Sequence, residues 1–113
     1  MKVVHKNQAV EFKNSETCTA LEYSLGDKDI NGAVITLSGR YPESGYVVNE
    51  VCKELVFVVR GQGKLTVEGK QFELFDGDQA LILPGEKYFF EGDLEMFMPC
   101  IPAWYPEQHK EVT

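Results

Sequence analysis

Short runs of apolar and β-branched residues alternate with glycine-containing turns along almost the whole chain. None of these runs shows a helical period, and glycine tolerates the positive φ that tight turns need. Many short strands joined by tight turns are typical of a β-sandwich or β-barrel, so the sequence predicts an all-β protein. The predicted strands cover residues 9–13, 18–24, 32–38, 46–51, 54–60, 64–68, 71–75, 79–83, 87–91 and 94–100, with turns that include residues 61–63 and 91–93.

The length of the chain suits one folded domain. A chain of 113 residues buries roughly 65% of the surface that it exposes when unfolded, which is enough for one hydrophobic core. No repeat, linker or low-complexity stretch divides the sequence. We therefore expect a single domain over residues 1–113, in which residues 99–113 form a C-terminal tail.

The charge of the chain argues against several classes of partner. Its 18 acidic and 11 basic residues give a net charge of −7, which repels nucleic-acid phosphates and anionic lipid. We expect neither a nucleic acid nor a membrane as partner. Residues 1–12 carry charges where a signal peptide needs an apolar core, so we expect a cytoplasmic protein. The odd number of cysteines, Cys18, Cys52 and Cys100, indicates packed, reduced thiols rather than disulfides.

The predicted strand at residues 54–60 is apolar on both faces. Val56 and Val58 lie on one face, and Leu55, Phe57 and Val59 lie on the other. A strand of this kind needs cover on both sides, which the N-terminal strand or a second subunit could supply. We predict a homodimer.

Two segments carry a family resemblance. In the first, Glu54 is followed by six residues and then Gly61. In the second, Gly77 is followed by seven residues and Gly85, and Tyr88 comes after two more. Together, in this order and inside an all-β chain, these segments resemble the two signature segments of the cupin superfamily. The resemblance implies a cupin-type double-stranded β-helix, that is, a jelly-roll barrel.

The usual metal-binding histidines of that family are missing. The resemblance aligns the first two of them with Val48 and Glu50, or with Val47 and Asn49 in the alternative spacing. It aligns the third with Tyr88. The imidazole ligands that zinc, iron and copper prefer are therefore absent from the matched positions, so we predict no such cofactor.

A hard divalent cation is the alternative to a metal-free site. Glu50 and Glu54, with Tyr88 nearby, would offer the oxygen ligands that Mg²⁺, Ca²⁺ or Mn²⁺ accept. Sharing one ion would require the chain to bend between the two glutamates, because four residues of straight strand span about 13 Å.

The candidate ligand pocket follows from strand parity and from the resemblance. Glu50, Cys52 and Glu54 share one parity, which the resemblance places inside the barrel, and Tyr88 would face them. Cys52 suits packing better than nucleophilic chemistry, because neighbouring carboxylates raise a thiol pKa. Trp104 could close the barrel mouth or stack on a ligand, or lie with the tail over apolar surface. His109 is expected in solvent, as histidines near a terminus usually are, although the tail could carry it to the pocket.

Three functions remain open at this point. The first is a small-molecule-binding cupin whose acidic pocket takes a polar or carbohydrate-like ligand. The second is an isomerase or lyase for a sugar, sugar phosphate or keto-acid, using the same carboxylates as acid and base with or without a divalent cation. The third is an assembly or regulatory module in which the barrel is only a scaffold.

Overall fold

The computed structural model describes residues 1–113 and is all-β, as the sequence predicts. No helix is long and apolar enough to cross a membrane. Two short 3-10 turns, η1 (Lys6–Gln8) and η2 (Pro106–Gln108), lie near the ends of the chain. The strands are β1 (Val10–Ser15), β2 (Cys18–Tyr23), β3 (Asn31–Tyr41), β4 (Tyr46–Asn49), β5 (Lys53–Val67), β6 (Lys70–Phe75), β7 (Gln79–Ile82), β8 (Lys87–Ile101) and β9 (His109–Val112).

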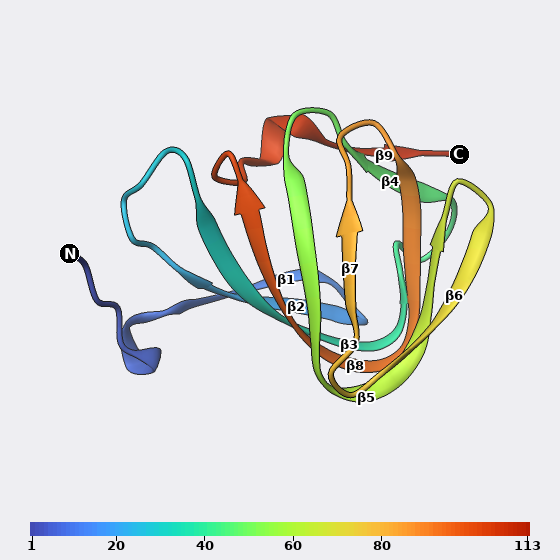
Figure 1. Cartoon of the computed structure of the whole chain (residues 1–113), viewed down its shortest axis with the longest axis horizontal. Helices are drawn as coiled ribbons and strands as arrows, with labels where there is room; N and C mark the ends of the chain where they lie inside the picture. The colour runs from blue at the N-terminus through green and yellow to red at the C-terminus, as the bar shows by residue number, and fades with distance from the viewer.

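One antiparallel sheet contains all nine strands. Its main path runs β1-β2-β3-β8-β4-β9, and β5 pairs with β6, β7 and β8. The long strands β3, β5 and β8 curl so that the sheet folds back on itself (Figure 1). Strands β4 and β9, with η2, lie across the end of this barrel that the curl leaves open (Figure 1).

Two predicted turns are in fact bends inside continuous strands. Residues 61–63 lie within β5 and residues 91–93 within β8, so each of these strands was predicted as two. Gly63 pairs with Gly92 where the bends cross. A Cβ on Gly92, whose φ is +124°, would lie 2.5 Å from the Cα of Gly63. Glycine is needed here because two backbones touch, not because the chain reverses.

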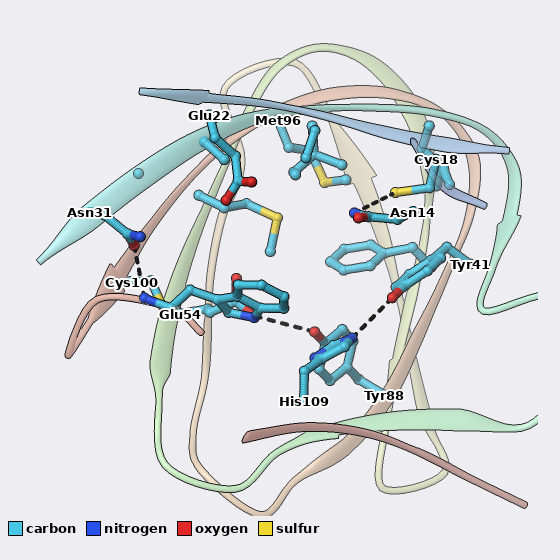
Figure 2. Close-up of a pocket in the computed structure, with 18 residues that line it drawn as sticks. Asn14, Cys18, Glu22, Asn31, Tyr41, Glu54, Tyr88, Met96, Cys100 and His109 are labelled. Atoms are coloured by element: carbon cyan, nitrogen blue, oxygen red, sulfur yellow. Dashed lines mark hydrogen bonds between the residues drawn. The ribbon is translucent and has the colours of Figure 1, made fainter. Parts of the chain in front are cut away.

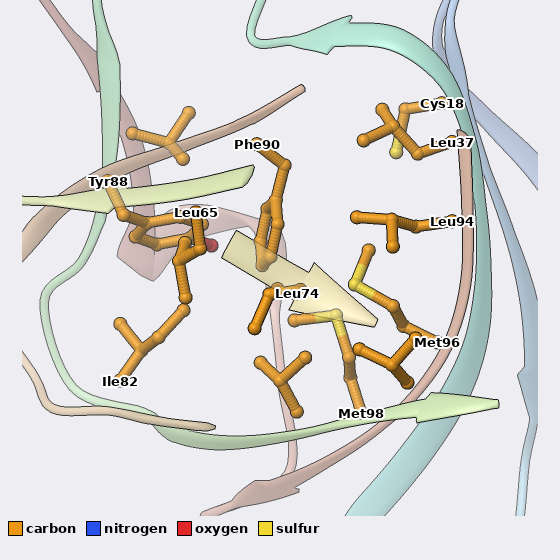
Figure 3. Close-up of a cluster of buried hydrophobic side chains, with 13 residues drawn as sticks. Cys18, Leu37, Leu65, Leu74, Ile82, Tyr88, Phe90, Leu94, Met96 and Met98 are labelled. Atoms are coloured by element: carbon orange, nitrogen blue, oxygen red, sulfur yellow. The ribbon is translucent and has the colours of Figure 1, made fainter. Parts of the chain in front are cut away.

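The core fills the concave side of the sheet. On β5, Val56 and Val58 are fully buried and alternate with outward-facing residues. On β8 one parity stays inward through the bend at Gly92, so that residues from Tyr88 to Cys100 line the interior. The side chains of this cluster interdigitate between β8, β5 and the neighbouring strands (Figure 3). Its 13 members are Cys18, Leu37, Val47, Val56, Val58, Leu65, Leu74, Ile82, Tyr88, Phe90, Leu94, Met96 and Met98.

Parts of the segment predicted as a tail belong to the sheet. Residues 99–101 continue β8, and β9 pairs with β4 in the register Asn49↔His109 to Tyr46↔Val112. This short strand has no apolar alternation to mark it in the sequence, because it sits at the sheet edge and only its pairing with β4 defines it. The pairing carries the end of the chain to the barrel mouth.

The outer face of β5 stays uncovered within the chain. Leu55, Phe57 and Val59 are 36%, 37% and 45% exposed. The N-terminal strand β1 does not lie on them, because it pairs with β2 at the far edge of the sheet. Of the two covers considered from the sequence, the N-terminal strand is thus excluded.

Candidate functional site

A buried polar cluster lies where β4, β5, β8 and the C-terminal segment meet. The Glu54 Oε1 accepts hydrogen bonds from the Asn49 Nδ2 and, at 3.2 Å, from the Tyr88 hydroxyl. The Asn49 Oδ1 accepts from the Gln108 Nε2 at 3.0 Å and faces the His109 Nδ1 at 2.7 Å. Asn49, Glu54, Tyr88 and Gln108 are buried. One amide side chain therefore joins a carboxyl group, an imidazole and a second amide.

Asn49 selects the tautomer of His109. The Asn49 Oδ1 can only accept, so the His109 Nδ1 must carry a hydrogen. In the neutral ring the Nε2 is then an acceptor, and the Tyr41 hydroxyl donates to it at 2.9 Å. The ring of His109 is also stacked with that of Tyr41, with centroids 6.2 Å apart. Its orientation is thus held from two sides.

Burial shifts the pKa values of the Glu54 carboxyl and the His109 imidazole in opposite directions. It raises the pKa of the Glu54 carboxyl, although the hydrogen bonds from Asn49 and Tyr88 partly offset this. It lowers the pKa of the His109 imidazole. The pKa of the Tyr88 hydroxyl rises through burial and, secondarily, through the nearby Glu54. Each of these groups is therefore biased toward its uncharged form.

The cluster opens onto a cavity of ≈ 160 Å³. Of its 18 lining residues 12 are hydrophobic, so the wall is mostly apolar. Figure 2 shows Glu54, Tyr88 and His109 on one side of this cavity and Glu22 on the other. The lining residues are Asn14, Cys18, Ala20, Glu22, Asn31, Gly32, Ala33, Ile35, Leu37, Tyr41, Glu54, Tyr88, Phe90, Met96, Met98, Cys100, Trp104 and His109.

Solved structures resemble the fold of this chain, although no protein-family model and no curated protein matches its sequence. Pac13, described as a unique nucleoside dehydratase, is 17% identical with a TM-score of 0.86, over 96% of this chain and 88% of that chain. A Streptomyces PAC13 variant with uridine gives 16% identity and a TM-score of 0.87 over the same shares. Ectoine synthase from P. lautus is 14% identical with a TM-score of 0.75, over 100% of this chain and 91% of that chain.

A fourth neighbour carries the fold name. The cupin domain of Schizosaccharomyces pombe Cnp3 is 10% identical with a TM-score of 0.69, over 85% of this chain and 70% of that chain. The protein is a small cupin-fold domain. The resemblance seen in the sequence is thereby confirmed for the fold, and at such low identities the likeness establishes the fold alone.

Within this cupin-fold domain, the predicted placement of Glu50 in the pocket is wrong. Glu50 is exposed and does not line the cavity. Strand β4 ends at Asn49 and β5 begins at Lys53, and the irregular link between them shifts the inward parity by one residue. Asn49 therefore points inward in the place assigned to Glu50. The alternative spacing of the resemblance, which selects Val47 and Asn49, is the one the structure follows.

The other predicted pocket residues lie at different depths. Glu54 and Tyr88, which are far apart in the sequence, are in contact inside the barrel. Trp104 lines the cavity and holds its place through its backbone N–H, which donates to the Asn31 Oδ1 at 3.1 Å. Cys52 is fully buried but does not line the cavity, whereas Cys18 and Cys100 do. All three cysteines are unpaired, as the sequence predicts.

The polar cluster does not fit the metal site typical of cupins. No three His, Cys, Asp or Glu side chains converge as metal ligands would. Both amide atoms of Asn49 and the Oε1 of Glu54 are instead used in hydrogen bonds with each other and with their neighbours. The predicted alternative, a hard cation between Glu50 and Glu54, loses one ligand because Glu50 faces solvent.

Sequence reasoning missed several residues of this site. Asn49 had a signal, since the alternative spacing of the resemblance pointed to it. No sequence signal pointed to Tyr41 or Glu22. A polar strand residue that faces a cavity cannot be distinguished in sequence from one that is half exposed to solvent. His109 was expected in solvent, and only the pairing of β9 with β4 brings it to the cavity.

Proposed function

We propose that this cupin-fold protein binds a small polar molecule in the cavity that Trp104 helps to line. The observation that carries the proposal is the connected polar cluster at one side of a mostly apolar, partly enclosed cavity. Ligand sites are typically apolar hollows with a few convergent polar groups, which set the orientation of the ligand. The neighbours described as a nucleoside dehydratase and an ectoine synthase support a small-molecule ligand.

The ligand that suits this cavity is hydroxylated at one end and flat or apolar at the other. Glu54, Tyr88 and Tyr41 offer both donors and acceptors to hydroxyl groups. Trp104 and the apolar wall suit a sugar face or a small ring. A carbohydrate or a nucleoside combines these features. The pocket keeps two carboxyl groups, as many as the sequence predicts, but Glu22 rather than Glu50 is the second one.

A matched pair of variants tests this proposal. Glu54→Gln removes the buried carboxyl, while Glu50→Gln makes the same chemical change on the exposed glutamate. We expect a panel of sugars and nucleosides, including uridine, to contain a ligand that raises the Tm of the wild type, because a ligand that binds only the native state stabilises it. Glu54→Gln and Tyr88→Phe should each lower the affinity for that ligand by about tenfold, and Glu50→Gln should leave it unchanged. Equal weakening by Glu50→Gln, or none by Glu54→Gln, contradicts the proposal.

A lyase is the second candidate, and the opposite pKa shifts of Glu54 and His109 favour it. A carboxyl group with a raised pKa and an imidazole with a lowered pKa on one cavity wall can act as an acid and a base. Dehydration of a β-hydroxy carbonyl compound would use both. A carbon-bound proton would pass to the Tyr41 oxygen as the Tyr41 proton moves to the His109 Nε2. The C–O bond would break toward oxygen, and this oxygen would take the Glu54 proton and leave as water.

Solvent exchange separates the lyase from a simple binding protein. Incubating a bound β-hydroxy carbonyl ligand in D₂O should show, by NMR, deuterium incorporation at the acidic carbon and loss of the hydroxyl group. His109→Gln should abolish the exchange while the ligand still raises Tm. A bound ligand that shows neither exchange nor turnover excludes the lyase and leaves the binding function.

We also propose that two copies associate through the outer face of β5. The support is its exposed apolar side chains, which continue onto neighbouring strands as Leu81, paired with Leu55, and Phe97, paired with Phe57. An apolar surface of this kind commonly marks an interface. A cytoplasmic location and the lack of a nucleic-acid partner remain predictions from the sequence.

A further inference from the structure

The cavity wall contains acidic groups but no permanent cation. Glu22 and Glu54 line it, whereas none of its 18 lining residues is Lys or Arg. Its single imidazole, His109, is engaged by Asn49 and Tyr41. Lys28, in the loop before β3, is exposed, and so is Lys2, whose Nζ donates to the Gly26 carbonyl of that loop. A ligand inside the cavity therefore meets no counter-ion for a negative charge.

Glu22 is the unpaired member of this wall. It shares the inward parity of Cys18 and Ala20 on β2, and its carboxyl projects into the cavity opposite Glu54 (Figure 2). It takes part in neither of the two ion pairs of the protein and in no side-chain hydrogen bond. Partial burial raises its pKa. Its lone pairs are free to accept hydrogen bonds from a ligand.

We infer that the cavity discriminates against anions: it admits an uncharged or cationic hydroxylated molecule and rejects the phosphorylated or carboxylated counterpart, with Glu22 setting this selectivity. The inference rests on the proposed binding function and narrows its ligand class. An anionic ligand would face the Glu22 carboxylate with no neutralising cation on the wall, and charges of like sign repel. Sugar phosphates and keto-acids, which the sequence left open as substrates, fall in the rejected class.

Matched ligand pairs test the selectivity on the wild-type protein. The pairs are D-glucose with D-glucuronate and uridine with uridine 5′-monophosphate, each measured by calorimetry and thermal shift at neutral pH. We expect the uncharged member of a binding pair to bind at least about tenfold more tightly than the anionic member. An anionic member that binds equally or more tightly overturns the inference and leaves the binding function intact. If no member of any pair binds, nor any other sugar, nucleoside or amine, both proposals fail.

Variants of Glu22 assign the selectivity to this residue. Glu22→Gln keeps the shape and removes the charge, so it should narrow the preference within a pair by roughly threefold or more. Glu22→Lys should reverse the preference. Glu11→Gln is the matched control, because Glu11 is exposed on β1, next to β2, and lies outside the cavity. If Glu11→Gln changes the preference as much as Glu22→Gln, net charge alone sets it and the role of Glu22 is refuted.

Discussion

A carboxyl group buried among amide and hydroxyl donors dominates this protein at the scale of single residues. Glu54 is 8% exposed, and its Oε1 accepts from both Asn49 and Tyr88. These bonds favour its ionised form, but burial opposes ionisation more strongly, so its pKa is raised. The balance favours the protonated form of this carboxyl group in the cavity.

The raised pKa of Glu54 predicts how stability depends on pH. Between its ordinary pKa of 4.5 and the raised value, the folded protein holds a proton that the unfolded chain has released. Stability from this group is thus fully present below pH 4.5 and lost as pH rises through the folded pKa. Glu54→Gln, which does not titrate, should gain Tm relative to wild type as pH rises over this range.

Thermal melts across pH check this expectation, and Glu50→Gln controls for the change in net charge. A Tm difference between Glu54→Gln and wild type that stays constant with pH would show that Glu54 titrates alike in both states.

Asn49 offers a second prediction at this scale. Asn49→Asp would place a carboxylate against the His109 Nδ1, where the amide oxygen now accepts. An adjacent negative charge favours the imidazolium, so the pKa of His109 should rise by about one unit or more. NMR titration of the His109 ring protons measures this. Asn7→Asp, on the exposed η1, adds the same charge far from the cluster. If this variant raised the pKa of His109 as much as Asn49→Asp, a local role for Asn49 would be contradicted.

At the scale of elements, the crossing of β5 and β8 shapes the barrel. Gly63 and Gly92 face each other, and a Cβ on Gly63 would lie 2.3 Å from the Glu91 carbonyl oxygen. No side chain larger than hydrogen fits between these backbones. The bends let β5 pair with β7 over one half and with β6 over the other, which closes the sheet around the cavity.

Substitution at this crossing should be costly. Gly92→Ala combines a strained positive φ with a backbone clash, so we expect it to lower the free energy of unfolding by about 3 kcal/mol or more. Gly69 has a φ of +80° but no atom within 4 Å of an added Cβ, so Gly69→Ala introduces backbone strain without a clash. We expect it to lower the free energy of unfolding by about 1 kcal/mol. Denaturant unfolding compares the two, and equal costs would mean that the close approach is relieved cheaply.

At the scale of the whole molecule, the uncovered face of β5 decides the expected assembly. Leu81 on β7 is 54% exposed and pairs with Leu55, so it extends the exposed apolar surface of β5 onto β7. A second copy would bury these side chains, with a favourable free energy that grows with the apolar area removed from water. The cavity faces the other side of the sheet, so association would leave the ligand site open.

Sedimentation equilibrium tests the assembly. We expect the wild type to be a dimer and Leu81→Lys to be a folded monomer, because a buried unpaired charge is expensive at an interface. Phe12→Lys, on the exposed face of β1, should remain dimeric. A wild type that sediments as a monomer at all accessible concentrations would exclude this dimer.

The sequence predicted the elements whose signals are local. Strands β2, β6 and β7 appear within a residue of their predicted ends, because alternation and flanking turn residues mark them. Strands β5 and β8 were each divided at a glycine, since a glycine needed for close backbone approach looks the same in sequence as one needed for a turn. In the site, Glu54 and Tyr88 were placed correctly relative to each other, whereas Glu50 was not, because parity cannot be carried across the irregular link between β4 and β5.

By itself, then, the sequence determined an all-β domain, the pair of motifs that points to a cupin, and the loss of the usual metal-binding histidines. These properties depend on periodicity, spacing and residue type, which are local and readable along the chain. Only the tertiary structure decided that Asn49 replaces Glu50, that β9 brings His109 to the Tyr41 hydroxyl, and that Glu22 faces the cavity without a partner. Such contacts join residues distant in sequence, and the curl of the sheet, rather than any local preference, determines which of them meet.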